Sequence, residues 1–144
     1  MTQQGGVIAV TGATGFIGRA VVGELLRRGH GVRALIRSST KARESFGGLT
    51  GPSGQTVETV AGDVCDPGTL DRLMAGASAC IHLVGIIREV RAEPGRLPQT
   101  FERMHVLATQ RVLEACQRAG VPKDAPMAPL GVRPDGKAQY PRTK

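Results

Sequence analysis

The sequence predicts an α/β protein in which a parallel sheet carries helices on both faces. Short apolar runs alternate four times with segments of helical periodicity, an alternation typical of parallel sheets. The first run, VIAV at residues 7–10, has no polar alternation, which suits a strand buried on both faces. A glycine-rich turn, TGATGFIG at residues 11–18, connects this strand to the first helix. Right-handed crossovers then favour the strand order 3-2-1-4.

The first two strands and the helix between them follow from local patterns. The helix begins at Phe16, where the apolar residues start to recur at every third or fourth position. Arg27 falls in its last turn, where a cation complements the helix dipole, and Gly29 can end it. A second strand is expected at residues 32–36, and one or two helical turns are expected around residues 41–46.

The next strand–helix unit carries a capping signal. A third strand is expected at residues 56–61 and a fourth at residues 79–84. Between them, Asp66 is placed as an N-cap with Pro67 at the first helical position. A helix that begins at Pro67 and buries Leu70, Leu73 and Met74 therefore connects these two strands.

The C-terminal third of the chain is less regular. Residues 86–99 are interpreted as a long variable loop, followed by a helix over residues 101–119 that Gly120 ends. Residues 121–144 hold five of the nine prolines, so we expect this tail to be extended and irregular.

Composition narrows the class of protein. A chain of 144 residues fits one domain, and 40% hydrophobic with 22% charged residues suits a globular protein. The net charge of +7 is compatible with nucleic-acid binding. However, only 3% of the residues are aromatic, so bases would have almost no side chains to stack on, and we expect no nucleic-acid partner.

The three cysteines and three histidines are scattered along the sequence and predict no metal site. With neither a membrane-spanning run nor a secretory signal in the sequence, we expect a cytoplasmic protein.

The glycine-rich turn is the strongest functional signal. Its glycines have the spacing G-x-x-G-x-x-G: the first permits a tight turn, the second lets a diphosphate approach the main chain, and the third lets the helix pack closely. The helix N-terminus adds free N–H donors and partial positive charge. This context predicts a Rossmann-type, dinucleotide-binding fold. The contacts expected at the turn are Gly12, Thr14, Gly15, Phe16, Ile17 and Gly18.

The end of the second strand bears on the choice of coenzyme. An acid about 20 residues after the turn usually binds the ribose 2′-hydroxyl of NAD, but no Asp or Glu occurs between Glu24 and Glu44. Arg37 directly follows the strand instead, and a guanidinium there can grip a 2′-phosphate. We therefore predict NADP as the cofactor. The alternative is that Arg37 stacks on adenine, which leaves NAD open.

Two further strand ends fit the same ligand. Asp63 and Val64 follow the third strand, where the carboxylate could accept a hydrogen bond from an adenine amine, although a plain turn fits this spacing nearly as well. Val84 and Gly85 end the fourth strand, where a small residue lets the ligand pass.

The phrases TGATGFIG, ALIR, AGDV and IHLVG, in this order, resemble the short-chain dehydrogenase/reductase superfamily. The resemblance is strongest to its extended and atypical branch of sugar-nucleotide epimerases and dehydratases. Within that branch, HLVGIIRE, TFERMHVLATQRVLEAC and LGVRPDGKAQYPRTK are similar to the group related to the NAD(P)-binding accessory subunit of respiratory complex I. The resemblance implies an oxidoreductase or epimerase that uses a nicotinamide coenzyme.

The resemblance also implies a catalytic pair. The family motif Tyr-x-x-x-Lys matches Tyr140 and Lys144, where the lysine would lower the tyrosine pKa and the tyrosine would exchange a proton with substrate. Ala128 stands at the apparent place of the family's serine, and Pro126 and Pro129 oppose an internal fifth strand. A non-catalytic nucleotide sensor, or an accessory subunit of a larger complex, therefore remains an alternative.

We accordingly expect an NAD(P)-binding domain over residues 1–120 and a proline-rich tail over residues 121–144 that carries the remnant motif. The chain reads as truncated, with an incomplete C-terminal half. If the fourth strand has no fifth neighbour, its open edge favours a homodimer or a place in a larger assembly.

Overall fold

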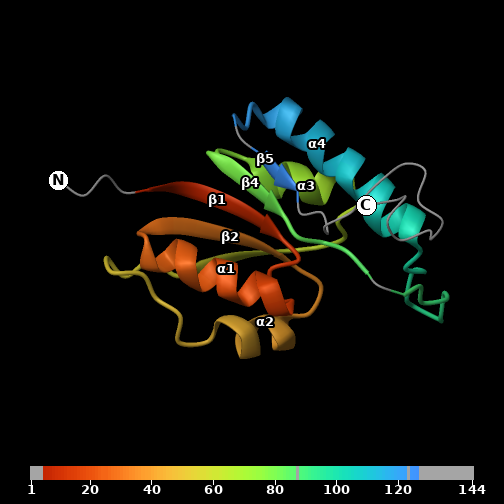
Figure 1. The fold of residues 1–144 in the computed structure, drawn as a ribbon, viewed down its shortest axis with the longest axis horizontal. Coiled ribbons are helices and arrows are strands. Elements are labelled where there is room, and N and C mark those ends of the chain that lie inside the picture. The colour runs from red at the N-terminus through yellow and green to blue at the C-terminus, as the bar shows by residue number, and fades with distance from the viewer. Residues whose placement is uncertain (1–4, 87, 123, 127–144) are drawn as a thin grey trace, which may run out of the picture.

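The computed structural model of the chain describes residues 5–86, 88–122 and 124–126. At its centre lies a parallel sheet with the strand order β3-β2-β1-β4-β5 (Figure 1). Its strands are β1 (Gly5–Thr11), β2 (His30–Ile36), β3 (Val57–Ala61), β4 (Ala79–His82) and β5 (Asp124–Pro126). The predicted order of the first four strands is confirmed.

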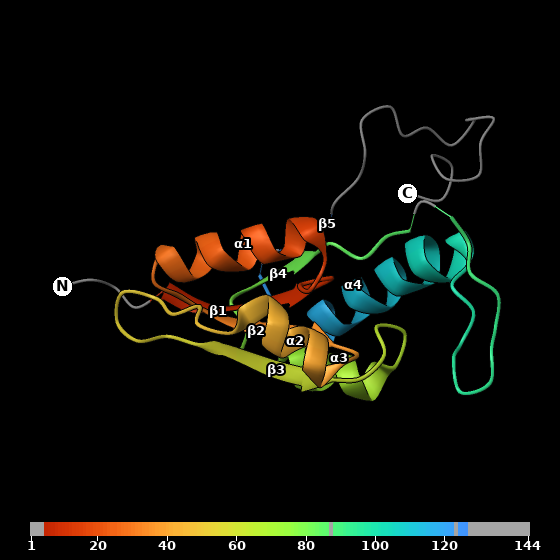
Figure 2. The ribbon, with the colours of Figure 1, turned by 90° about the horizontal axis from the view of Figure 1, so that it is seen from below.

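Helices cover both faces of this sheet, which makes a three-layer α/β/α arrangement (Figures 1 and 2). The helices are α1 (Phe16–Arg27), α2 (Ser39–Phe46), α3 (Pro67–Met74), the π-helical turn η1 (Glu102–Leu107) and α4 (Ala108–Ala119). One face carries α1 and α2, and the other carries α3 and α4.

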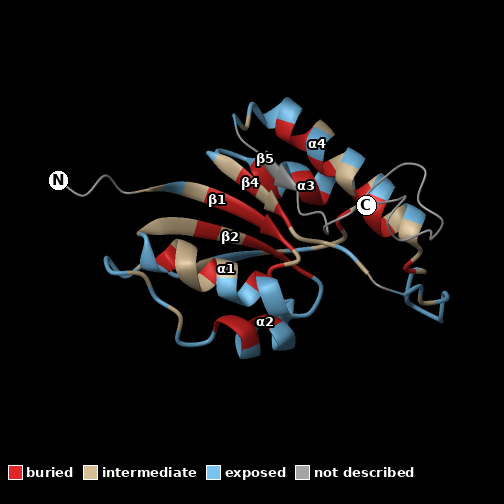
Figure 3. Ribbon diagram, viewed as in Figure 1, coloured by how far each residue is buried: buried red, intermediate tan, exposed pale blue. Residues whose placement is uncertain are grey.

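The strands bury side chains on both faces because their residues alternate between two cores. In β1, Ile8 and Val10 pack with Val22 and Leu26 of α1, whereas Ala9 belongs to the core under α3 and α4. All five residues are at most 8% exposed, and Figure 3 shows the buried stretch running along the middle of the sheet. This two-sided burial explains the continuous apolar run in the sequence.

The predicted helix signals are confirmed in the structure. The Asp66 carboxylate caps α3 by accepting hydrogen bonds from the backbone N–H of Thr69 at 2.8 Å and from its hydroxyl at 2.6 Å. Gly120 ends α4 in the left-handed conformation, with φ +67°. The helix predicted over residues 101–119 is present, but its first part is the π-helical turn η1.

The short strand β5 departs from the sequence prediction. Residues 124–126 lie in the tail expected to be irregular, yet they pair with β4 in the register Cys80↔Asp124 to His82↔Pro126. Within the described residues β5 pairs with β4 alone, so a proline there costs no ladder bond on the outer side of the strand. The open β4 edge on which the dimer prediction depended is therefore occupied.

Some predictions fall outside the described part of the chain. Ala128, Pro129, Tyr140 and Lys144 are among the residues that the structure does not describe. Among the described residues, no helix combines the length and apolar character needed to cross a membrane.

Candidate cofactor site

A cavity of about 580 Å³ lies where four strands end. Gly12 follows β1, Arg37 follows β2, Asp63 follows β3 and Val84 lies just beyond β4, and all four line it. In open α/β sheets, ligands bind at the carboxyl ends of the strands where the strand order reverses, here between β1 and β4. The cavity occupies this place. Its other lining residues are Thr14, Leu35, Ser38, Lys41, Gly62, Val64, Gly95, Arg96, Leu97, Pro98, Gln99, Arg103 and Met104.

The glycine turn shapes one side of the cavity. Gly12 has φ +69°, and a Cβ there would lie 2.8 Å from the carbonyl carbon of Leu83 and 2.9 Å from the nitrogen of Val84. A Cβ on Gly18 would collide with the carbonyl oxygens of Gly12 and Ala13. Gly12 is required by the close approach of the segment that follows β4, and Gly18 by the close packing of α1 on the turn.

The N-terminus of α1 is open at the same turn. Gly15 is its N-cap and is exposed, and no side chain in the described part of the chain caps this end. The amides of the first helical turn therefore lack the intrahelical acceptors that later residues have. An anion can bind there without displacing a protein side chain.

Of the eleven predicted cofactor-binding residues, six line the cavity and five do not. Those that do are Gly12, Thr14, Arg37, Asp63, Val64 and Val84. Gly15 and Gly85 are exposed outside it, Phe16 is 96% exposed, Ile17 is 44% exposed, and Gly18 is buried in the packing of α1. The structure thus separates residues that face the cavity from residues that shape or flank the turn.

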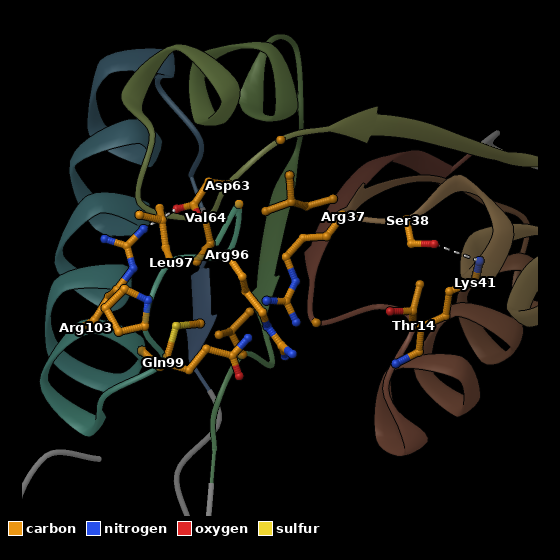
Figure 4. A pocket seen from close by; sticks show the side chains of 17 residues that line it. Thr14, Arg37, Ser38, Lys41, Asp63, Val64, Arg96, Leu97, Gln99 and Arg103 are labelled. Atoms are coloured by element: carbon orange, nitrogen blue, oxygen red, sulfur yellow. Dashed lines mark hydrogen bonds and ion pairs between the residues drawn. The ribbon is translucent and has the colours of Figure 1, made fainter. Parts of the chain in front are cut away.

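Three cations in and just after β2, Arg33, Arg37 and Lys41, have different roles. Arg37 points into the cavity, as Figure 4 shows, and its side chain makes no hydrogen bond or ion pair within the part of the chain that is described. Arg33 instead donates to the carbonyl oxygens of Leu73 at 3.1 Å and Ala75 at 2.6 Å and does not line the cavity. Of this group, Arg37 and Lys41 are the cations available to a ligand.

Asp63 is held in place at the opposite side of the cavity. Its Oδ1 accepts hydrogen bonds from the backbone N–H of Cys65 at 2.7 Å and from the Arg103 guanidinium of η1 at 3.0 Å. The ion pair fixes the carboxylate at the cavity wall (Figure 4). Burial raises the pKa of the neighbouring Cys65 thiol, so this thiol is not activated as a nucleophile.

Sequence reasoning missed the third side of the cavity. Residues 90–99, interpreted as a loop, form a hairpin with the antiparallel pairs Val90↔Gln99 and Glu93↔Arg96. Residues 95–99 of this hairpin line the cavity. The turn dipeptide Pro94-Gly95 was the available signal, since such dipeptides mark tight turns.

Two buried histidines hold the end of β4. The His82 Nδ1 lies 2.5 Å from the Thr11 hydroxyl of β1, and its Nε2 lies 3.2 Å from the Thr109 hydroxyl of α4. The His105 Nε2 lies 3.1 Å from the backbone nitrogen of Ile86. The His82 contacts hold the end of β4 against β1 and α4. The His105 contact holds the segment after Val84 against η1.

Residues 8–125 match the model of the NAD dependent epimerase/dehydratase family. The chain belongs to this family. The match covers the glycine turn, the strand ends around the cavity and the helix α4.

Curated proteins are similar to the chain over part of their own length. A ceramide reductase from Caulobacter vibrioides is 35% identical over 119 residues, which are 83% of this chain and 33% of that protein. A dTDP-glucose 4,6-dehydratase from Streptomyces antibioticus is 37% identical over 119 residues, 79% of this chain and 34% of that protein. The chain thus spans about a third of the curated relatives it matches.

Solved structures agree on the fold. The protein gox2253 superposes with a TM-score of 0.68 at 32% identity, over 93% of this chain and 38% of that one. A mutant uronate dehydrogenase from Agrobacterium tumefaciens, complexed with NAD, gives a TM-score of 0.62 at 24% identity, over 85% of this chain and 40% of that one.

The residues of the site fit NAD, the coenzyme in the name of the family. The glycine turn leaves no room for a Cβ at Gly12, the first amides of α1 are open, and cations lie at the end of β2. Amides and guanidinium groups are the donors that diphosphate and phosphate groups require. Family membership and the donor set together support a nicotinamide dinucleotide as the cofactor.

Proposed function

We propose that this chain is the coenzyme-binding part of an NAD(P)-dependent oxidoreductase or epimerase, and that it prefers NADP to NAD. The observation that carries the proposal is the position of Arg37, whose side chain has no ion pair in the described part of the chain and points into the cavity. It follows the strand whose end normally carries an acid in NAD-binding folds.

Each group in the cavity has a defined task in this proposal. At the glycine turn, the open amides of Phe16 and Ile17 in the first turn of α1 donate to the diphosphate, and Arg37 donates to the 2′-phosphate. Asp63, fixed by Arg103, accepts from the adenine amine. When bound, the nicotinamide ring supplies the group that accepts or gives a hydride.

We further propose that Tyr140 and Lys144 carry the proton transfer in the complete enzyme. Both residues match the family motif, and both lie outside the described residues. Tyr140 exchanges the proton with substrate, and Lys144 lowers the pKa of the tyrosine hydroxyl. The motif spacing supports these roles because residues four apart share one face of a helix.

The coenzyme preference is tested by Arg37→Gln. Calorimetry should show NADPH binding weakened at least tenfold, because hydrogen bonds between charged groups contribute about 1.5–3 kcal/mol each. NADH binding should change less than about twofold. Arg43→Gln is the control, because Arg43 is a cation of the following helix α2 that does not line the cavity. If NAD binds more tightly than NADP, or Arg37→Gln changes neither, the preference is refuted.

A non-catalytic sensor or accessory subunit is the second candidate. Ala128 in the apparent place of the family's serine favours it, since an alanine offers no hydroxyl to a reacting carbonyl. Incubation with NADPH and a panel of carbonyl compounds distinguishes the two. Turnover that Tyr140→Phe abolishes would exclude the sensor, whereas tight NADPH binding without turnover would favour it.

A further inference from the structure

We propose that Arg96 is a second ligand for the coenzyme 2′-phosphate, so that Arg37 and Arg96 hold this phosphate from two sides of the cavity. The inference rests on the proposed function and adds a specificity-determining residue to it. Arg96 belongs to the hairpin of residues 90–99, which no glycine-turn motif includes.

The hairpin is positioned by backbone and side-chain contacts. The N–H of Val90 donates to the carbonyl of Gln99 at 2.9 Å, and the N–H of Gln99 donates back at 2.8 Å. Next to this base, the Glu89 carboxylate accepts from the Phe101 N–H at 2.8 Å. Gln99 is 8% exposed, so the base of the hairpin is packed into the molecule. Arg96 is thereby held at the cavity although it lies far from the glycine turn in sequence.

The cavity has an excess of positive charge. Its lining contains Arg37, Lys41, Arg96 and Arg103, whereas Asp63 is the one carboxylate among the lining residues and already pairs with Arg103. Like Arg37, the Arg96 side chain makes no hydrogen bond or ion pair within the described residues. Two unpaired guanidinium groups that face one cavity repel each other, and this repulsion is relieved when an anion binds between them.

A phosphate monoester matches this arrangement better than a singly charged anion. It carries close to two negative charges at neutral pH, and its oxygens accept paired hydrogen bonds from a guanidinium. Figure 4 shows Arg37 and Arg96 entering the cavity from different elements and directed toward the same part of it.

The diphosphate is the other phosphate source in the same ligand. It is common to both coenzymes and has its own donors in the open amides of α1. Arg96 shares its part of the cavity with Arg37, which we assign to the adenosine ribose. The proposal therefore commits to the 2′-phosphate, and the two coenzymes separate the possibilities.

The test is Arg96→Gln in the whole chain, with binding of NADPH, NADH and adenosine 2′-monophosphate measured by calorimetry. NADPH and adenosine 2′-monophosphate should bind on the order of tenfold more weakly, because a charged, paired hydrogen bond is lost. NADH should change less than about twofold. Arg91→Gln is the matched control, because Arg91 is an exposed arginine of the same hairpin that does not line the cavity.

Thermal unfolding without ligand separates a binding role from a structural one. The Arg96→Gln midpoint should equal or exceed that of the unmodified protein, because one of two repelling charges is removed. Arg96→Lys should recover part of the NADPH affinity through its charge but lack the paired geometry. A lowered midpoint with unchanged NADPH binding would overturn the proposal.

The remaining outcomes distinguish this inference from the proposed function. Equal weakening of NADPH and NADH would place Arg96 at the diphosphate and overturn the inference. If Arg37→Gln weakens NADPH and Arg96→Gln does not, the inference fails and the proposed function stands. If the unmodified chain binds neither coenzyme, both fail.

Discussion

At the scale of single residues, the three glycines of the turn serve different physical purposes. Gly12 has a positive φ, and it also has no room for a Cβ because the backbone of Leu83 and Val84, just beyond β4, lies close to it. Gly18 has ordinary helical geometry and is fixed by packing against the carbonyls of the turn. Gly15 is exposed, and a Cβ there would lie 3.3 Å from the carbonyl oxygen of Gly12. The protein therefore restricts Gly15 less severely than it restricts Gly12 and Gly18.

The packing role of Gly18 leads to a stability prediction. Gly18→Ala should lower the free energy of unfolding by about 1–3 kcal/mol, the usual cost of overpacking, because backbone atoms cannot rotate away as a side chain would. Gly23→Ala, on the same helix, meets nothing within 4 Å and should raise it by about 0.5–1 kcal/mol through helix propensity.

Urea unfolding of both variants and the unmodified chain measures these effects. Destabilisation of similar size in both variants would show that a helical glycine, not the contact with the turn, matters at residue 18.

At the scale of elements, the strands and helices that could be predicted are those marked by a pattern in their own residues. Strands β1 and β2 were predictable because their apolar residues fill both cores, and α3 because Asp66 and Pro67 mark its start. Strand β5 is three residues long and exists through its pairing with β4, which no local pattern encodes. The hairpin of residues 90–99 was missed for the same reason, since its few backbone pairs join mostly polar residues.

The cap of α3 leads to a pH prediction. The Thr69 hydroxyl and backbone N–H hold the pKa of Asp66 below its ordinary value of 3.8. A carboxyl whose pKa is depressed by folding contributes stability that is full above the unfolded pKa and is lost as the pH falls through the folded one. The difference in unfolding free energy between the unmodified chain and Asp66→Ala should therefore be constant above about pH 5 and shrink below pH 3.8.

Denaturant titrations from neutral pH to acid measure this difference. Asp66→Asn should retain most of the stability at neutral pH, because asparagine caps helices about as well. A difference for Asp66→Ala that stays the same down to acid pH would show that the charge on the cap is irrelevant.

At the scale of the whole molecule, the parallel sheet creates the site by bringing strand ends together. Gly12 and Arg37 were predictable as residues of the cavity because each directly follows a strand, and Asp63 because it follows β3 after one intervening glycine. Arg96 and Arg103 reach the same cavity from the hairpin and from η1, and their positions depend on tertiary packing. Local sequence patterns thus predict the part of the cavity that the strand ends form. The part formed by the hairpin and η1 depends on tertiary packing.

The pairing of β5 with β4 determines how fast the backbone amides of β4 should exchange with solvent. Amides alternate in direction along a strand, so an edge strand leaves every other amide open to solvent. Because β4 lies between β1 and β5, the amides of residues 79–82 should all exchange slowly in residue-resolved hydrogen exchange. Strand β3, which pairs on one side with β2 among the described residues, is the internal control and should show alternating fast and slow amides. If β4 shows the same alternation, β5 does not pair with β4 in solution. The exposed edge of β4 would then favour association of the protein, which sedimentation at rising protein concentration would detect.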